Sequence, residues 1–338
     1  MADQVRMADI AAKLGLSIVS VSKALAGEKG VSEETRRRVR QAAEELGYRA
    51  NARRRTETHT IGALLPSRYL ENDTGFYWQM YQELARQAMR EDCMVLIERL
   101  TDAQAREGVL PALITERKAE GLVLIGKPPF GYVERLKRSW GIPVVYLDFS
   151  SPLADMDAVV SNSFFGAAAT TEYLIERGHR EIGFYGTLTA TDSIQDRYLG
   201  FVRALIRHRL PLKMEWVLED RDPETGLMLP VNMGRRLPQK LPTAFVCNCD
   251  LAAVDLIKAL KARGLRVPED VSVVGYDDYL PGGAAEPPLT TWAVDMAEMA
   301  RQAISLFLAR SRGEITKPTM RLVCGQLVER ESVASRNP

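Results

Sequence analysis

The chain has 338 residues, of which 46% are hydrophobic and 26% are charged, and its formal net charge at pH 7 is +1. This length allows two or three structural units. Because the net charge is so small, the total charge of the chain does not indicate a nucleic-acid or membrane partner. No run approaches the roughly 18 apolar residues of a membrane span. Charged residues interrupt the first 15 positions, unlike a secretory signal. We therefore expect a cytoplasmic protein without a membrane partner.

Charge is distributed unevenly along the chain. Residues 1–60 contain 12 Lys and Arg against 8 Asp and Glu, an excess of four positive charges, whereas the remainder is slightly acidic. The four cysteines, Cys93, Cys247, Cys249 and Cys324, are expected to be buried reduced thiols. A metal site at Cys247 and Cys249 has weak support because no second Cys or His pair lies nearby in sequence. No metal or cofactor is expected.

The first predicted element is an amphipathic helix. Met7, Ile10, Ala11 and Leu14 follow the i, i+3, i+4, i+7 spacing of one helical face. Gly15 then supplies the left-handed residue that ends such a helix.

A second helix is predicted to start after Ser17, which is a suitable N-cap. Its apolar face contains Val21, Ala24 and Leu25, while Val19 and Lys23 point to the opposite side.

Ser32 is predicted to cap a third helix, whose buried stripe contains Val39, Ala42, Ala43 and Leu46. Two interpretations fit three short amphipathic helices: an ordinary helical bundle, or a helix-turn-helix unit that reads the DNA major groove. The cluster Arg36, Arg37, Arg38 and Arg40 favours the second, since arginines contact phosphates, although a solvated helix face explains part of it.

Residues 7–27, "MADIAAKLGLSIVSVSKALAG", and 31–51, "VSEETRRRVRQAAEELGYRAN", resemble the DNA-reading unit of the LacI family of bacterial transcription regulators. The resemblance implies that Ser17 and Ser22 hold phosphates, while Ile18, Val19 and Lys23 face base edges. Apolar side chains there suit thymine methyl groups.

The following segment, residues 49–60, departs from the family pattern. Asn51 is kept, but Ala50 stands where proline is usual and no leucine occurs. Two alternatives stay open for Arg53, Arg54 and Arg55: contact with phosphates or a narrow minor groove, or a flexible basic linker. Asn51 is counted with these arginines as a candidate DNA contact.

From Ile61 onward, short β-rich runs alternate with helical stretches, which predicts parallel sheets covered by helices, arranged as two α/β lobes. Helices are expected around 75–91, 102–117, 163–177, 191–208, 250–263 and 295–312. Neither a GxGxxG following a strand nor a P-loop motif occurs.

Two aspartates follow strand-like runs: Asp148 ends "VVYLD" and Asp277 ends "VVGYD". Ligands of open α/β sheets sit at the carboxyl ends of strands, and carboxylates there can accept hydrogen bonds from polyol hydroxyls. Helix capping is the alternative for each.

The family resemblance continues through "RGHREIGFYG", "DRYLGF", "VPEDVSVVGYDD", "PPLTT" and "LVERES". It implies a helix-turn-helix domain over 1–48, a linker over 49–60, and a periplasmic-binding-protein-like (type I) domain over 61–338 that binds an effector and dimerises. Lobe one would comprise about 61–160 and 292–322, and lobe two about 161–291 and 323–338. Arg197 would donate to effector hydroxyls, Asp148 and Asp277 would accept from them, and Phe76 and Met296 would supply apolar walls.

The run "CNCD" places Cys249 where relatives have asparagine, with Asn248 one residue earlier. Successive strand residues face opposite sides, so either Cys249 lines the effector site or Asn248 reaches it through a local bend.

An enzyme is not expected, because none of the three histidines, His59, His179 and His208, lies at a strand's carboxyl end beside a nucleophile. The predicted function is a sequence-specific transcriptional regulator, a repressor by default, that binds palindromic double-stranded operator DNA as a homodimer. A small-molecule effector between the lobes, a sugar or sugar derivative, would control operator affinity. The alternative is a solute-binding protein for carbohydrate uptake or sensing without DNA binding.

Overall fold

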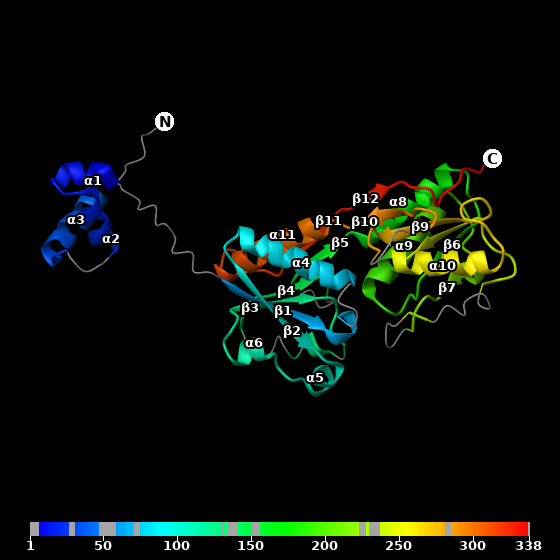
Figure 1. Cartoon of the computed structure of the whole chain (residues 1–338), viewed down its shortest axis with the longest axis horizontal. Helices are drawn as coiled ribbons and strands as arrows, with labels where there is room; N and C mark the ends of the chain where they lie inside the picture. Colours follow the sequence, from blue (N-terminus) through cyan, green and yellow to red (C-terminus); the bar gives the residue numbers. More distant parts are fainter. Residues whose placement is uncertain are drawn as a thin grey trace. The chain divides into compact units, whose positions relative to one another are not determined.

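The computed structural model describes residues 7–26, 31–46, 59–70, 75–129, 131–133, 135, 141–150, 156–222, 228–229, 237–280 and 285–336. The chain divides into two compact units, Met1–Thr58 and His59–Pro338. Figure 1 shows a helical first unit and a second unit of two sheet-containing lobes. This arrangement confirms the predicted fold class, although the predicted contacts Asn51, Arg53, Arg54 and Arg55 lie outside the described residues.

The first unit contains α1 (Met7–Leu14), α2 (Ile18–Ala26) and α3 (Glu33–Glu45). Its core is small and apolar, consisting of Ile10, Ala11, Val21, Ala24, Val39, Ala42 and Ala43. Gly15 adopts φ +64°, the left-handed conformation predicted to end α1. The backbone N–H of Ser20 donates to Ser17 Oγ at 3.1 Å, so Ser17 caps α2, and Thr35 N donates likewise to Ser32 Oγ at 3.2 Å.

Lobe one of the second unit is a six-stranded sheet in the order β11-β5-β4-β3-β1-β2, with every neighbouring pair parallel. Its elements are β1 (Thr60–Pro66), η1 (Ser67–Tyr69), α4 (Phe76–Arg90), β2 (Met94–Leu100), α5 (Asp102–Glu107), α6 (Ala112–Thr115), β3 (Gly121–Ile125), β4 (Val144–Leu147), β5 (Asp157–Ser161), α11 (Met296–Ser311) and β11 (Met320–Val323). The helix expected over 102–117 is split, because Gly108 is left-handed at the end of α5 and Pro111 precedes α6.

Lobe two is a second six-stranded sheet in the order β12-β10-β9-β8-β6-β7, parallel except for the β10–β12 pair. Its elements are α8 (Ser163–Glu176), β6 (Ile182–Tyr185), α9 (Asp192–Arg207), η2 (Met214–Trp216), β7 (Val217–Leu218), β8 (Ala244–Cys247), α10 (Asp250–Ala262), β9 (Ser272–Asp277), β10 (Thr290–Ala293) and β12 (Gln326–Val328). The chain crosses between the lobes after β5, after β10 and after β11. Each crossing lies one or two residues beyond the predicted lobe boundary.

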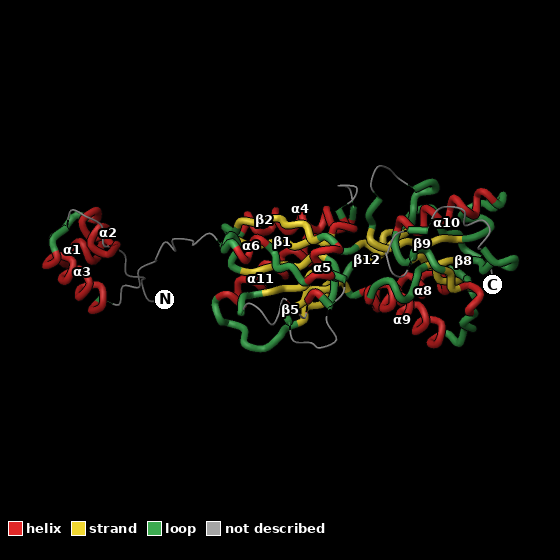
Figure 2. The backbone as a smooth tube through the Cα atoms, turned by 90° about the horizontal axis from the view of Figure 1, so that it is seen from below, coloured by secondary structure: helices red, strands yellow, loops and turns green. Residues whose placement is uncertain are grey.

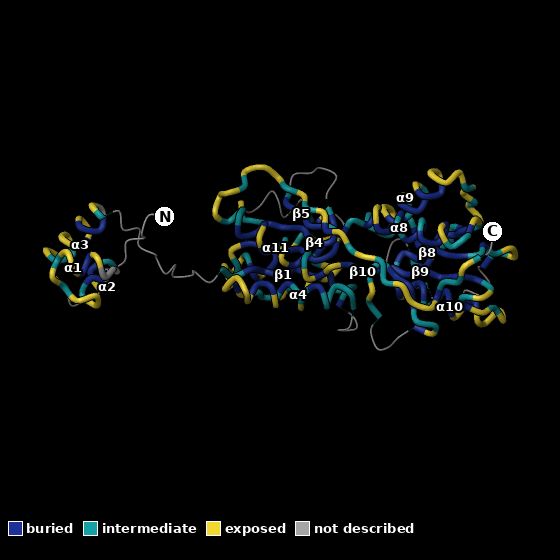
Figure 3. Tube along the Cα trace, turned by 90° about the horizontal axis from the view of Figure 1, so that it is seen from above, coloured by how far each residue is buried: buried dark blue, intermediate teal, exposed yellow. Residues whose placement is uncertain are grey.

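Both sheets are buried between helices, as the strands enclosed by helices in Figure 2 show. Along β1, Ile61, Ala63 and Leu65 pack with α4 and α11, whereas Leu64 faces the opposite core. This alternation follows the period of two along a strand. In Figure 3 the central strands β4, β8 and β9 are buried and exposure concentrates on the outer loops and helix surfaces. No described helix has both the length and the apolar composition needed to cross a membrane.

Candidate functional sites: a DNA-reading face and an interlobe cluster

The outward face of α2 is the candidate DNA-reading face. Ile18 is 54% exposed and Val19 is 64% exposed, and Lys23 is also exposed, while Val21 and Ala24 of the same helix are fully buried. The helix is therefore anchored by one side and presents two apolar side chains and one cation on the other. The side chain of Ser22 lies outside the described part of the molecule.

The arginines of α3 divide into two groups. Arg36 and Arg37 form ion pairs of 3.0 Å with Glu33 and Glu34, respectively, one helical turn earlier. Arg38 and Arg40 are exposed. Among the described side chains, two of the four arginines thus pair with glutamates of their own helix, which is what a solvated helix face would show, and two are exposed.

A second group of polar side chains lies between the lobes, at the carboxyl ends of the strands. We call it the interlobe cluster and define it as Tyr69, Phe76, Tyr77, Asp148, Arg197, Arg221, Cys249 and Asp277. Five of these residues, Phe76, Asp148, Arg197, Cys249 and Asp277, were predicted from the sequence.

Arg197 on α9 and Asp277 at the end of β9 form the centre of the interlobe cluster. Arg197 Nη2 lies 3.3 Å from Asp277 Oδ1, and Nη1 donates to the main-chain oxygen of Asn248. The guanidinium carbon lies 3.9 Å from the centroid of the Tyr276 ring, so the guanidinium group and the ring form a cation–π contact. Burial raises the pKa of Asp277 to about 7, and the Arg197 charge acts in the opposite direction.

Asp148 belongs to lobe one, where it follows β4, and is 7% exposed. Burial raises the pKa of its carboxyl to about 6, opposed by the charge of Arg197 and by a hydrogen bond from Tyr77. Asp148 adopts φ +67° and Asp277 φ +105°, conformations that a non-glycine residue rarely takes and that are frequent at binding sites. Neither aspartate caps a described helix, so the capping alternative is wrong for both.

Aromatic rings surround these charged groups on the lobe one side. The ring centroids of Tyr69 and Tyr77 are 4.2 Å apart, and those of Phe76 and Tyr77 are 5.3 Å apart. Phe76 also meets Tyr279 of lobe two edge to face, at 6.4 Å between centroids. Met296 begins α11 and is buried in the same hydrophobic cluster as these rings. An apolar wall therefore extends across both lobes.

Asn248 has a supporting position rather than a place at the surface of the site. It is fully buried, and its Nδ2 donates to Asp220 Oδ2 at 2.8 Å and to the main-chain oxygen of Tyr185 at 3.2 Å. Its Oδ1 accepts from Arg221 at 3.1 Å. Of the two alternatives for this run, the burial of Asn248 favours Cys249, which is partly exposed and caps α10 by accepting the backbone N–H of Ala252. The effector contact itself stays a prediction.

Sequence reasoning missed Arg221, Tyr69 and Tyr77. Arg221 follows β7, a two-residue strand too short to be recognised by alternation. Its Nη2 contacts Asp220 Oδ2 at 2.6 Å and Cys249 Sγ at 3.3 Å. The signal that could have located it is the Asp-Arg pair after "WVLE", which repeats the strand-end polar pattern of Asp148 and Asp277.

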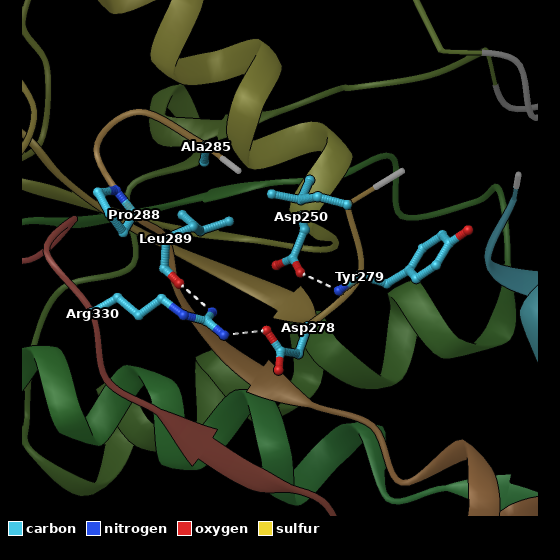
Figure 4. A pocket seen from close by; sticks show the side chains of 8 residues that line it. Asp250, Asp278, Tyr279, Ala285, Pro288, Leu289 and Arg330 are labelled. Carbon is cyan, nitrogen blue, oxygen red and sulfur yellow. Dashed lines mark hydrogen bonds and ion pairs between the residues drawn. The ribbon is translucent and has the colours of Figure 1, made fainter. Parts of the chain in front are cut away.

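A cavity of about 240 Å³ lies beside the interlobe cluster in lobe two (Figure 4). Asp250 Oδ2 accepts the backbone N–H of Tyr279 at 2.7 Å, and Arg330 donates to Asp278 and to the main-chain oxygen of Leu289, both at 2.8 Å. Burial raises the pKa of Asp250 to about 8. Since these groups satisfy one another, we assign the cavity no separate function.

The described residues contain no group of three or more His, Cys, Asp or Glu that could hold a metal ion. His179 is fully buried between Thr243 and the main-chain oxygen of Ala334, as expected for a residue that fixes a turn. The expectation of four buried thiols holds for Cys93 and Cys247 but is wrong for Cys249, which is partly exposed, and for Cys324, which is exposed between the edge strands β11 and β12.

A small capped helix-turn-helix unit followed by a two-lobed α/β domain is the architecture of a DNA-binding regulator. Residues 6–51 match the model of the bacterial regulatory proteins of the lacI family, and residues 171–333 match that of a periplasmic binding protein-like domain. The chain belongs to the LacI family and is a DNA-binding transcriptional repressor rather than an enzyme.

Similar proteins cover nearly the whole chain. The HTH-type transcriptional repressor PurR of Pectobacterium carotovorum subsp. carotovorum is 30% identical over 334 residues, 96% of each chain. The structure of the transcriptional regulator CelR in complex with cellobiose is 25% identical, with a TM-score of 0.69 over 97% of this chain and 99% of that one. The lac repressor dimer bound to operator and the anti-inducer ONPF is 21% identical, with a TM-score of 0.67 over 98% of this chain and 100% of that one, and shows the shared fold.

Proposed function

We propose that this cytoplasmic repressor binds a palindromic operator as a homodimer and that a sugar or sugar derivative bound between its lobes releases the DNA. The observation that carries the DNA-binding part is the exposure of Val19 and Lys23 on a helix that Ser17 caps and a closed core anchors. Such a helix fits the major groove. A solute-binding protein without DNA binding, the alternative, does not account for this unit.

The proposed effector class rests on Asp148 and Asp277. Both end strands, both face Arg197, and carboxylates accept hydrogen bonds from neighbouring hydroxyls. The aromatic wall suits the apolar face of a sugar ring. Similarity to the CelR–cellobiose complex supports the same class.

The proposed mechanism is a population shift. An effector that contacts Asp148 of lobe one and Arg197 of lobe two favours one lobe angle over others, because it binds both lobes at once. In the homodimer this angle sets the spacing of the two linkers and thereby operator affinity, with a typical coupling of about 1–3 kcal/mol.

Dimerisation through the second unit is supported by exposed apolar side chains on lobe one. Met89 on α4 is 69% exposed, and Met94 and Ile97 on the edge strand β2 are 55% and 39% exposed. Two linked DNA-reading units bind far better than one because the second binds at a high effective concentration.

The first test is operator binding. The purified protein should shift the electrophoretic mobility of palindromic fragments from its own promoter region at low salt. Its affinity for them should fall by about a thousandfold between 50 and 200 mM salt, as expected for a protein that contacts several phosphates. A scrambled fragment of equal length is the control. Absence of any sequence-dependent shift at low salt would overturn the proposed function.

A second prediction concerns the pH dependence of effector binding. In the unliganded protein, burial holds the pKa values of Asp148 and Asp277 at about 6 and about 7. Hydroxyl donors favour the ionised carboxyl and therefore lower these pKa values in the complex. The effector should thus bind most tightly above about pH 7 and weaken as the pH falls through 7 and then 6, because protons must leave on binding.

Calorimetric titration from about pH 5 to about pH 8 checks this, using the carbohydrate that raises the melting temperature most in a screen. Asp277→Asn should remove the part of the pH dependence near pH 7 and retain the part near pH 6. An affinity that stays constant over this range would contradict the assignment of both carboxyls as effector contacts.

A further inference from the structure

One corner of the interlobe cluster is built from cations. We call it the cationic corner and define it as Arg68, Tyr69 and Arg221. Arg68 and Tyr69 belong to η1, directly after β1 in lobe one, and Arg221 follows β7 in lobe two. The two lobes thus each contribute one guanidinium group at the carboxyl ends of their strands.

Among the described residues, Arg68 is positioned by main-chain and aromatic contacts. Its Nη2 donates to the main-chain oxygen of Lys127 at 2.9 Å, and its guanidinium carbon lies 5.0 Å from the centroid of the Tyr69 ring. Its Nε is buried and has no hydrogen-bond partner among the described residues. Lys127 itself pairs with Asp192 at 2.8 Å. Arg68 therefore has a buried Nε donor that no described residue satisfies, an arrangement that is costly without an acceptor.

Arg221 is held rigidly on one side only. Nε and Nη2 donate to Asp220 at 2.9 and 2.6 Å, and Nη2 also donates to Asn248 Oδ1. Asp220 is fully buried, and its backbone N–H donates to the hydroxyl of Thr187. Nη1 contacts no acceptor among the described residues. The planar guanidinium is thus fixed with one nitrogen available, the pre-organisation that suits an oxyanion.

Contacts connect both arginines of the cationic corner to the residues around the two aspartates. Arg68 lies against the Tyr69 ring, whose centroid is 4.2 Å from that of Tyr77. Arg221 Nη2 contacts Cys249 Sγ at 3.3 Å and Asn248 Oδ1, and the main-chain oxygen of Asn248 accepts from Arg197, the partner of Asp277. The corner therefore offers hydrogen-bond donors near the aspartates, which offer acceptors. A ligand that satisfies both must carry hydroxyl groups at one end and an acceptor-rich group at the other.

We propose that the cationic corner binds an anionic group of the effector, a carboxylate or a phosphate, while Asp148 and Asp277 accept hydrogen bonds from hydroxyls of the same molecule. The effector is then an anionic polyol, such as a sugar acid or a sugar phosphate, rather than a neutral sugar. The anion bridges Arg68 of lobe one and Arg221 of lobe two, so its binding draws the lobes together. This inference rests on the proposed function, because it names the effector class of that site.

The test measures thermal shifts and calorimetric affinities of the full-length protein with matched compounds. The carboxylate probes are D-gluconate, D-glucuronate and D-galacturonate, and the phosphate probes are glucose 6-phosphate and galactose 6-phosphate. Glucose and galactose are the uncharged sugar probes, and hypoxanthine is an uncharged nucleobase probe. Acetate and inorganic phosphate are controls for the anion alone. We expect at least one anionic sugar to bind and to release the operator, with no effect of its uncharged counterpart; which group binds identifies carboxylate or phosphate.

Two variants and one control locate the interaction. Arg68→Gln should weaken the anionic sugar by roughly tenfold or more, the loss of one charge-assisted hydrogen bond. Arg221→Lys keeps a charge opposite Asp220 but removes the planar fork, and should also weaken binding. Arg90→Gln makes the same charge change at the far end of α4 and should leave the affinity unchanged. Melting temperatures and operator affinities of the unliganded variants verify that they fold.

Binding of a neutral sugar or of hypoxanthine as tight as that of the anionic compounds would overturn the proposal, as would an unchanged affinity in folded Arg68→Gln. So would the failure of every anionic probe. These outcomes are separable from failure of the proposed function, because release of the operator by a neutral sugar would leave the repressor mechanism intact, whereas a protein that does not bind an operator would fail the earlier test.

Discussion

Replacing Arg197 with alanine is expected to abolish release of the operator by the effector while leaving the operator affinity of the unliganded protein nearly unchanged. The substitution removes the ion pair with Asp277 and the hydrogen bond to the Asn248 main chain. Hydrogen bonds of a charged group typically contribute about 1.5–3 kcal/mol each. Arg197 of lobe two also interacts with Asp148 of lobe one. Its loss therefore removes the side chain that would couple effector binding to both lobes.

Fluorescence anisotropy of a labelled operator, with and without effector, measures both quantities. Arg207→Ala is the matched control, since Arg207 lies on the same helix but is largely exposed and pairs with Glu172 at 3.1 Å. Loss of operator binding by a folded Arg197→Ala protein would show that Arg197 stabilises the unliganded structure of the second unit instead of binding the effector. The pKa of Asp277 should rise further in this variant, because its opposing cation is gone.

Replacing Val19 with glutamate should weaken operator binding by roughly tenfold to hundredfold, as expected from about 1–3 kcal/mol for a mismatched contact. The new carboxylate would face an acceptor-rich, negatively charged groove. The fold of the first unit should persist, because Val19 is 64% exposed and contributes nothing to the core around Val21.

The control for this prediction is Gln41→Glu, which makes the same charge change at an exposed position of α3. Electrophoretic mobility shifts at one salt concentration compare the two variants, and circular dichroism confirms their helix content. Equal weakening by both substitutions would mean that net charge alone matters and that Val19 is not at the interface.

Most helices of the second unit were predictable because their signals are local. The helix expected over 191–208 is observed as α9, Asp192–Arg207, and that expected over 250–263 is observed as α10, Asp250–Ala262. The strands β5, β7, β10, β11 and β12 were not predicted. They have two to five residues each, and those at the sheet edges, β7, β11 and β12, have only half-buried or exposed residues at most positions, so they lack the apolar runs that marked the buried strands.

The interlobe cluster was only partly predictable for the same reason. Asp148 follows the buried strand β4 and Asp277 ends the buried strand β9, so both were predicted from their positions, whereas Arg221 follows a two-residue strand that could not be recognised. The sequence left Asn248 and Cys249 as alternatives, and only the tertiary structure shows that the Asn248 side chain is bonded to Asp220 and to the main chain of Tyr185 inside lobe two. Tyr69 and Tyr77 gave no signal, because aromatic residues in a helical turn or at the start of a helix are ordinarily part of a core.

The sequence by itself determined the features whose causes lie within a few residues: the caps at Ser17 and Ser32, the buried stripe of each helix, and the outward direction of Val19 and Lys23. Only the tertiary structure decided which side chains meet between the lobes. The ring contact of Phe76 in lobe one with Tyr279 in lobe two joins residues that are far apart in the sequence, and the chain crosses between the lobes three times. Such contacts depend on the order of strands in two sheets, and no local pattern of apolar and polar residues encodes that order.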